Sequence, residues 1–168
     1  MADLLELVKI VGSVSGICSA AFLIVDRYTK HYPAAIMVAR PLIEGSVNIA
    51  HFLLLKNYSE RPIIISWQHE ANHLCLAKDD STLSIVRSVM PGETVISLGP
   101  NAETYLRVIK PNGHDKIDPE NSLEVQLRWR FAQPMLWKVD RTIRIGMRKR
   151  DFDEMTDKYV AGVGIRDS

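Results

Sequence analysis

The sequence predicts a mainly β protein, a two-sheet β-sandwich preceded by an N-terminal transmembrane helix. Three observations support this prediction. The segment Ile10–Val25 is apolar and contains no charged residue. After Pro33, no long stretch has the helical period, and short runs rich in β-branched and aromatic residues alternate with turn residues. The length of 168 residues, 46% of them hydrophobic, is enough for one domain with a buried core.

The overall composition excludes several classes of protein. The 21 Lys and Arg residues balance 20 Asp and Glu residues, so the net charge of +1 gives no general attraction to nucleic acid. With 9 glycines and 8 prolines, the chain is neither collagen-like nor of low complexity. The two cysteines, Cys18 and Cys75, have no spacing that suggests a disulfide, which favours a reducing compartment for most of the chain.

The N-terminal apolar segment is interpreted as a single membrane-spanning anchor. A helix over Leu4–Val25 would be about 33 Å long, close to the hydrocarbon thickness of a bilayer. A cleaved signal peptide and a partner-bound helix of a soluble protein are the alternatives. Acidic Asp3 and Glu6 stand where a signal peptide carries cations. Because Arg27 and Lys30 follow the span, the positive-inside rule predicts a membrane protein whose C-terminal domain is cytoplasmic.

Small residues recur every fourth position within this segment, at Gly12, Gly16 and Ala20. On a helix these three residues stack on one face, where two backbones can approach closely. We therefore expect a homo-oligomer that forms through this helix face.

The rest of the chain divides into short predicted strands. Leu123–Phe131 is the clearest, because apolar and polar residues alternate strictly along it, as in a strand with one buried face. A short helix is expected over Asp151–Lys158. The predicted domains are residues 1–33 (helix and juxtamembrane turn), 34–150 (sandwich) and 151–168 (short helix and tail). The predicted strands are Ala34–Ala39, Ser46–Lys56, Ile63–His69, Leu74–Ala77, Thr82–Val86, Glu93–Leu98, Glu103–Ile109, Leu123–Phe131 and Arg141–Met147.

Two segments carry a resemblance to a known kind of domain. Residues 56–65 read KNYSERPIII, which is similar to the N-x-S-x-R-P-I-x-I segment of small bacterial immunoglobulin-like domains. Residues 98–108, LGPNAETYLRV, resemble their later L-x-P-x-E-x-x-L-x-V segment. The chain thus resembles bacterial single-pass membrane-anchored proteins with an immunoglobulin-like β-sandwich. This resemblance implies a fold and transfers no catalytic residue.

The segment His69–His73, HEANH, matches the H-E-x-x-H motif of zinc peptidases. On an α-helix, His69 and His73 would bind zinc from one face while Glu70 acted as the general base. A third ligand would come from elsewhere in the chain: Glu103, His114 or Asp118. The preceding isoleucines favour a strand, in which the two histidines would lie about 13 Å apart, too far for one metal. A zinc-dependent metallopeptidase is therefore an alternative, and the leading prediction has no cofactor.

Cations concentrate between Arg128 and Arg150, and alternation along two strands would gather them on one sheet face. Such a face attracts anionic lipid headgroups, nucleotides or acidic protein partners. The candidate binding residues are Arg128, Arg130, Lys138, Arg144 and Arg148.

The function predicted from these features is that of a membrane-anchored, non-catalytic binding, adaptor or sensor module. Its expected partners are membrane lipid, a protein and an anionic ligand. Besides the zinc peptidase, the alternative is a membrane effector that senses an anionic ligand or nucleotide through Arg128, Arg130 and Arg144.

Overall fold

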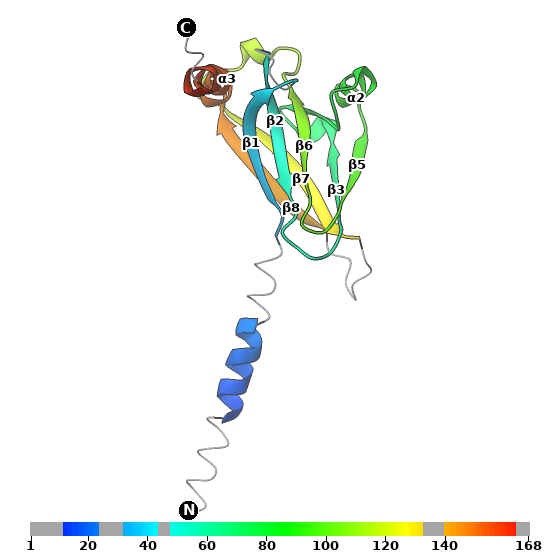
Figure 1. Cartoon of the computed structure of the whole chain (residues 1–168), viewed down its shortest axis with the longest axis vertical. Helices are drawn as coiled ribbons and strands as arrows, with labels where there is room; N and C mark the ends of the chain where they lie inside the picture. Colours follow the sequence, from blue (N-terminus) through cyan, green and yellow to red (C-terminus); the bar gives the residue numbers. More distant parts are fainter. Residues whose placement is uncertain (1–11, 24–31, 44–47, 133–139, 164–168) are drawn as a thin grey trace, which may run out of the picture. The chain divides into compact units, whose positions relative to one another are not determined.

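The computed structural model describes residues 12–23, 32–43, 48–132 and 140–163. The chain forms two compact units, Met1–Tyr32 and Pro33–Ser168. In the first unit a helix covers residues 12–23, and its side chains are exposed. All the helices and strands labelled in Figure 1 belong to the second unit.

The prediction of an N-terminal transmembrane helix is wrong. Among the described residues, no helix has the length and apolar character needed to cross a bilayer. The described part of this helix, residues 12–23, accounts for about 18 Å at 1.5 Å per residue, against a bilayer hydrocarbon core of about 30 Å. The predicted single-pass topology depended on this span.

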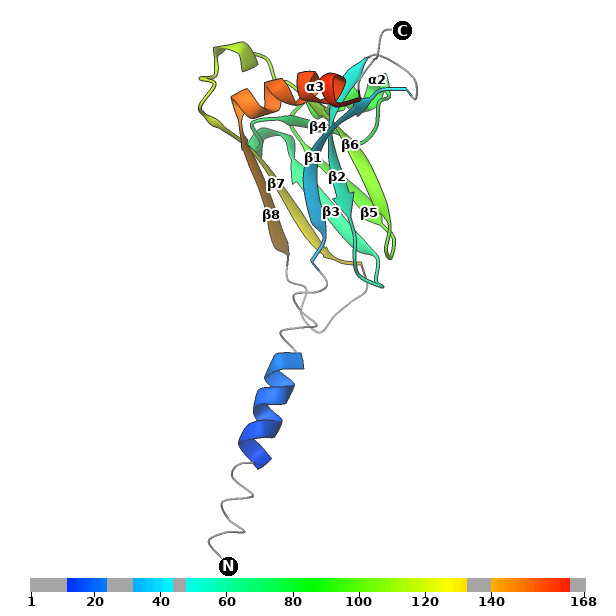
Figure 2. The ribbon, with the colours of Figure 1, turned by 60° about the vertical axis from the view of Figure 1, so that its left-hand side comes forward.

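In the second unit, the described strands form two four-stranded antiparallel sheets, which confirms the mainly β prediction. The first sheet has the order β1-β2-β6-β4 and the second the order β5-β3-β7-β8. Figures 1 and 2 show the two sheets stacked face to face. The bounds of the first sheet are β1 Ala34–Pro41, β2 Ile49–Lys56, β6 Glu103–Ile109 and β4 Cys75–Ala77. Those of the second sheet are β5 Glu93–Leu98, β3 Ile63–Gln68, β7 Ser122–Phe131 and β8 Arg141–Arg148.

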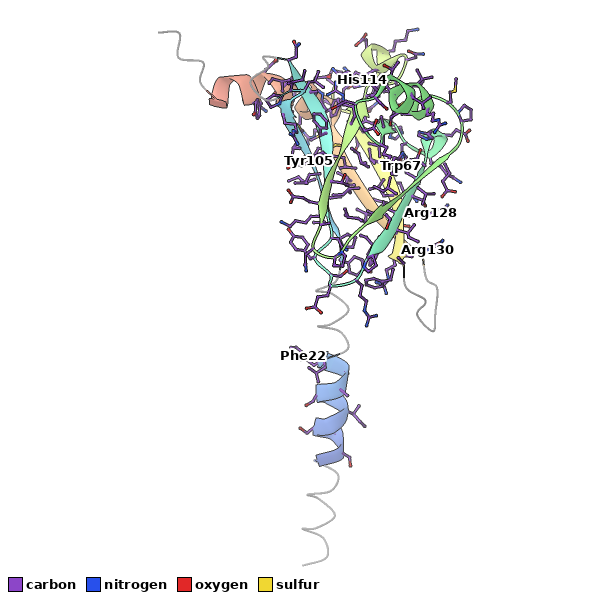
Figure 3. The ribbon with its side chains drawn as sticks, turned by 45° about the vertical axis from the view of Figure 1, so that its right-hand side comes forward. Phe22, Trp67, Tyr105, His114, Arg128 and Arg130 are labelled. Carbon is purple, nitrogen blue, oxygen red and sulfur yellow. The ribbon has the colours of Figure 1, made fainter. Side chains whose placement is uncertain are left out.

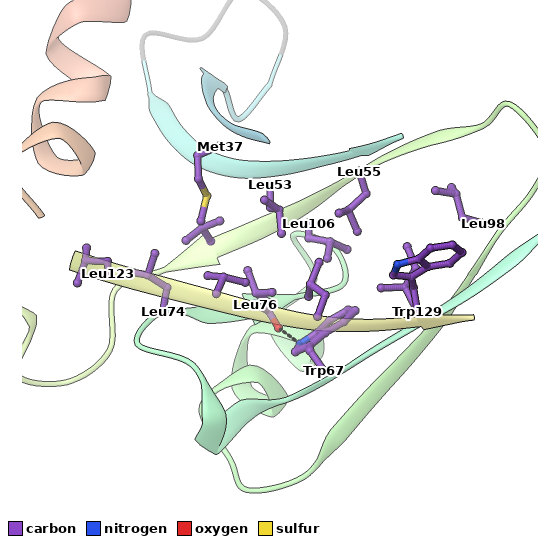
Figure 4. Packing of buried hydrophobic residues seen from close by; sticks show 14 of the residues in the cluster. Met37, Leu53, Leu55, Trp67, Leu74, Leu76, Leu98, Leu106, Leu123 and Trp129 are labelled. Atoms are coloured by element: carbon purple, nitrogen blue, oxygen red, sulfur yellow. Dashed lines mark hydrogen bonds between the residues drawn. The ribbon is translucent and has the colours of Figure 1, made fainter. Parts of the chain in front are cut away.

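The core lies between the sheets and consists of the inward residues of each strand. Along β7, Leu123, Val125, Leu127 and Trp129 are buried, as the alternation of the sequence predicts. Trp67 of β3 is 1% exposed, and its indole Nε1 donates a hydrogen bond to the carbonyl of Leu76, 3.2 Å away in the other sheet (Figure 4). That bond satisfies the one polar atom of a side chain whose rings occupy the centre of the core.

The motif that suggested an immunoglobulin-like domain forms a buried hydrogen-bond network. The Asn57 side chain is 0% exposed. Its Nδ2 donates to the carbonyls of Arg61 and Gly99, each 2.8 Å away. Its Oδ1 accepts bonds from the backbone N–H of Ser59 (3.0 Å) and from the Ser59 hydroxyl (2.7 Å). All four bonds belong to one amide, so Asn57 fixes the turn between β2 and β3.

The same network brings the two segments of the resemblance together. The backbone N–H of Asn57 donates to the carbonyl of Ala102, and that of Asn101 donates to the carbonyl of Ser59. The β2–β3 and β5–β6 connections therefore lie against each other. Both connections pass from one sheet to the other, so the network fixes the sheets at one end.

The predicted strand Thr82–Val86 is wrong, because this segment forms the helix α2 Thr82–Ser88. The Ser81 hydroxyl caps the helix by accepting a bond from the backbone N–H of Ser84, 3.2 Å away. Asp79 in turn accepts from the backbone N–H of Ser81 at 3.0 Å and orders the turn before the cap. This side-chain capping outweighs the strand preference of the β-branched residues in the segment.

A second helix, α3 Lys149–Val163, lies at one end of the sheets (Figure 2) and contacts β1, β2 and β8. It is longer than the predicted Asp151–Lys158. Its first N–H groups are satisfied by loop carbonyls: Lys149 donates to Asn121 and Arg150 to Pro119, each at 2.9 Å. The 3-10 turns η1 His69–Ala71 and η2 His114–Lys116 complete the described elements of the second unit.

Candidate functional site

The outer face of the second sheet gathers four of the five predicted binding residues. Because alternate side chains of a strand point to opposite faces, burial of Leu127 and Trp129 leaves Arg128 and Arg130 outside. Antiparallel pairing then sets Arg128 beside Ser66 of β3 on one side and Thr142 of β8 on the other. Figure 3 shows Arg128 and Arg130 together on β7. We call this surface the basic face.

Two further arginines of the basic face lie on β8. Arg144 pairs with Gln126, and Arg148 pairs with Ser122 at the other end of the ladder. Both side chains are exposed. Lys138, the fifth predicted residue, lies outside the described residues.

Ion pairs neutralise part of the basic face. Arg130 lies 3.8 Å from the carboxylate of Asp140, and Arg148 lies 3.3 Å from that of Glu120. These side chains are about half exposed, so each pair is weak and can be displaced by a competing anion. Within the described residues, no ion pair engages Arg128 or Arg144. Of the four arginines described on the basic face, these two are therefore the most available to a partner.

A hollow of about 310 Å³ opens on the same face. Its origin is a small residue between larger ones, because Ser66 lies between Val95 of β5 and Arg128 of β7 in the same row of the sheet. Sequence reasoning missed Ser66, Glu93 and Val95, since only the strand register brings them beside the arginines. The lining residues are Ile64, Ser66, Glu93, Val95, Arg128, Trp129, Arg130 and Asp140.

The HEANH segment does not form the α-helix that a zinc peptidase requires. His69 and Glu70 belong to the 3-10 turn η1, which ends before the extended Asn72. The Nε2 of His69 is 2.9 Å from the hydroxyl of Thr94, and the Nδ1 of His73 accepts a bond from the backbone N–H of Glu124 at 3.1 Å. In the described part of the chain, no group of three metal-ligating side chains comes together. The segment instead lies in the connection between β3 and β4, and His73 joins it to β7 through two hydrogen bonds with the backbone of Glu124.

Gly12, Gly16 and Ala20 all lie on helix 12–23. A Cβ added at either glycine would meet nothing within 4 Å. The predicted self-association of this helix stays a prediction.

A polar cluster that the sequence did not reveal holds α3 against the sandwich. The Asp153 carboxylate accepts bonds from Lys110 (2.6 Å), His114 (3.0 Å) and Lys149 (3.2 Å). Burial alone would raise the pKa of Asp153, but these three donors outweigh it and hold the pKa well below its usual range. His114, labelled in Figure 3, is 3% exposed and packs beside Phe152.

His51 of β2 also contacts α3, through Phe152. Its ring stacks on Phe152 with 4.0 Å between centroids, and its Nε2 donates to the Phe152 carbonyl at 2.8 Å. Burial lowers the pKa of His51, with the nearby charges of Lys110 and Arg107 acting in the same direction and the bond to Phe152 opposing them. The folded protein therefore binds a proton at His51 less readily than the unfolded chain does.

The lowered pKa of His51 predicts that the stability of the protein depends on pH. In the unfolded chain His51 has a pKa of about 6.5, and its pKa is lower in the folded protein. As the pH falls below about 6.5, the unfolded chain binds a proton at His51 more readily than the folded protein does, so the free energy of unfolding decreases. We expect urea unfolding of the wild type to show a loss of stability from pH 7 to pH 5. His51→Gln retains an N–H donor but does not titrate, so its loss over this range is expected to be smaller. Equal losses in the two proteins would show that His51 is not responsible.

Comparison with known proteins adds one structural likeness. No family model matches the chain, and no curated protein matches it. Among solved structures, the chaperone DraB of E. coli is similar over 68% of this chain and 54% of that chain, with 12% sequence identity and a TM-score of 0.30. The chain thus spans about half the length of that structure's chain. A likeness at this TM-score carries no argument about function, and the immunoglobulin-like assignment stays a prediction.

Proposed function

We propose that this protein is a non-catalytic binding module that holds an acidic protein segment against the basic face. The observation that carries the proposal is the pair of exposed guanidinium groups, Arg128 and Arg144, that have no ion pair within the described residues. Gln126 pairs with Arg144 and is two positions from Arg128 on β7, so its side-chain amide is next to both arginines and can form hydrogen bonds with a ligand.

The strand geometry suits an extended partner. Arg128 and Arg144 lie on neighbouring strands, one row of outward residues apart, because Arg128 pairs with Thr142 and Gln126 with Arg144. Their Cα atoms are therefore roughly 8 Å apart by sheet spacings. Carboxylates at alternate positions of an extended segment repeat about every 6.8 Å. This repeat is close to the distance between the Cα atoms of Arg128 and Arg144, and the long arginine side chains can span the difference. Charge complementarity of this kind governs encounter rate and specificity.

Charge reversal on the basic face tests the proposal. The probe is a fluorescein-labelled peptide of alternating glutamate and alanine, measured by fluorescence anisotropy with the full chain at low salt. The double variant Arg128→Glu/Arg144→Glu is expected to weaken binding at least about tenfold, equivalent to about 1.4 kcal/mol. Added salt should weaken wild-type binding as well, because exposed charges are screened.

Arg148→Glu is the matched control. It reverses one charge on β8, as Arg144→Glu alone does, at a guanidinium already paired with Glu120. Arg148→Glu is expected to weaken binding much less than Arg144→Glu does. The proposal fails if the wild type does not bind the peptide, or if the double variant binds it as tightly as the wild type does.

A further inference from the structure

The hollow at Ser66 contains a balanced set of charges. Among the residues that the structure describes, two arginines, Arg128 and Arg130, and two carboxylates, Glu93 and Asp140, line it. Their formal charges cancel, so a ligand with net negative charge would pair with the arginines and be repelled by the carboxylates at once. A ligand with one group of each sign pairs with both kinds of side chain.

Several of these polar groups are available to a ligand. Over the described ranges, no hydrogen bond or ion pair occupies the Ser66 hydroxyl, the Glu93 carboxylate or the Arg128 guanidinium. The Arg130–Asp140 pair is long, at 3.8 Å, and both side chains are about half exposed. Asp140 can stay beside Arg130 when a ligand binds, because one guanidinium has five N–H donors and can bind a second carboxylate.

The register places the opposite charges at a useful separation. Val95 pairs with Ser66 and Ser66 with Arg128, so β5 and β7 are two strands apart, about 10 Å. Glu93 pairs with Gln68, one outward row from Ser66, so its Cα is roughly 12 Å from that of Arg128 by sheet spacings. Ser66 and Val95 lie beside this gap, and Ile64 pairs with Arg130. Val95 is 57% exposed, and an organic ligand would cover this apolar surface.

We propose that the hollow at Ser66 binds a small zwitterion, a free amino acid or dipeptide. Its carboxylate lies between Arg128 and Arg130, and its ammonium group lies at Glu93. The Ser66 hydroxyl bonds the polar backbone of the ligand, and Ile64 and Val95 contact its carbon atoms. The volume of about 310 Å³ is at the lower end of the range for small-molecule sites, about 300–1,000 Å³. This inference rests on the proposed function in one respect, since both require the basic face to be the binding surface.

The inference is tested by isothermal titration calorimetry of the full chain with leucine and with the dipeptide Gly-Leu. The two affinities show whether the hollow prefers a free amino acid or a dipeptide. Arg128→Ala and Glu93→Gln are each expected to weaken binding at least about tenfold. N-acetyl-Gly-Leu, which lacks the ammonium group, should bind the wild type about as weakly as Gly-Leu binds Glu93→Gln. Inorganic phosphate, an anion without an ammonium group, should bind more weakly than Gly-Leu.

Arg87→Ala is the control, since Arg87 is an exposed arginine of α2 that does not line the hollow. Its affinity for Gly-Leu should equal that of the wild type. The inference is overturned if neither Gly-Leu nor leucine binds the wild type, if phosphate binds more tightly than both, or if Arg128→Ala and Glu93→Gln leave binding unchanged. Circular dichroism of each variant checks that it is folded.

The two proposals fail in different ways. If the Arg128→Glu/Arg144→Glu variant loses acidic-peptide binding and the wild type binds no zwitterion, the proposed function stands and the zwitterion site is rejected. If the wild type binds a zwitterion in a way that requires Glu93 but does not bind the acidic peptide, the zwitterion site stands and the acidic protein partner is rejected.

Discussion

Asn57→Ala is expected to lower the free energy of unfolding by about 3–4 kcal/mol, because it removes four hydrogen bonds from one buried side chain. The N–H of Ser59 loses its acceptor, and the carbonyls of Arg61 and Gly99 each lose one of two donors, while the Ser59 hydroxyl keeps its bond to the Arg61 carbonyl. Each buried polar group left without a partner costs about 1–3 kcal/mol, and relaxation of the turn recovers part of the sum. Urea unfolding followed by tryptophan fluorescence measures the loss.

The neighbouring position supplies the control for this variant. Tyr58 lies in the same turn, directly between Asn57 and Ser59, but its side chain is 54% exposed. Tyr58→Ala should change the free energy of unfolding by less than about 0.5–1 kcal/mol, the range for an exposed side chain with one weak cation–π contact. If Asn57→Ala is no more destabilising than Tyr58→Ala, the network does not hold the turn.

Phe152→Ala is expected to destabilise the protein by about 3–5 kcal/mol, the usual cost of deleting a buried aromatic side chain. Phe152 of α3 is 0% exposed and belongs to the buried core cluster, against which Met155 of the same helix also packs. Its ring stacks on His51 and lies near the ring of His114, so its loss leaves a cavity beside two histidines. Denaturant unfolding gives the total loss, and hydrogen exchange of the α3 amides reports whether the helix detaches before the sheets unfold.

Asp157→Ala is the matched change on the exposed side of the same helix. It should lower stability by less than about 0.5 kcal/mol. If Phe152→Ala and Asp157→Ala have equal effects on α3 exchange, the helix is not held by the core contact of Phe152.

The sequence predicts most of the sandwich because the evidence for each strand is local. Alternation along Leu123–Phe131 and the turn residues around Glu93–Leu98 locate these strands within a residue of their observed ends. The Thr82–Val86 strand was wrong for an equally local reason. The cap at Ser81 depends on a hydroxyl whose effect is not visible in hydrophobic periodicity, so β-branched Thr82, Ile85 and Val86 suggested a strand.

The candidate site is only half predictable. Alternation brings Arg128 and Arg130 to one face of a strand, and that much can be inferred from the order of residues. Glu93 and Ser66 join them through the pairing of β5, β3 and β7, and register between distant strands is set by the packed core rather than by local sequence. The transmembrane prediction is wrong because it took an apolar composition as evidence for a long helix, and no described helix has the length and apolar character to cross a bilayer.

The network at Asn57 has a consequence for how the sandwich assembles. A single amide joins its own turn to the carbonyl of Gly99, which is 42 positions further along the chain. Both sheets are also built from strands distant in sequence, since β2 pairs with β6 and β3 with β7. Closing such long loops costs chain entropy before the contacts they permit are formed, so we expect slower folding than in a protein built from local contacts. The hydrogen bonds of Asn57 are complete only when the β2–β3 and β5–β6 connections have met.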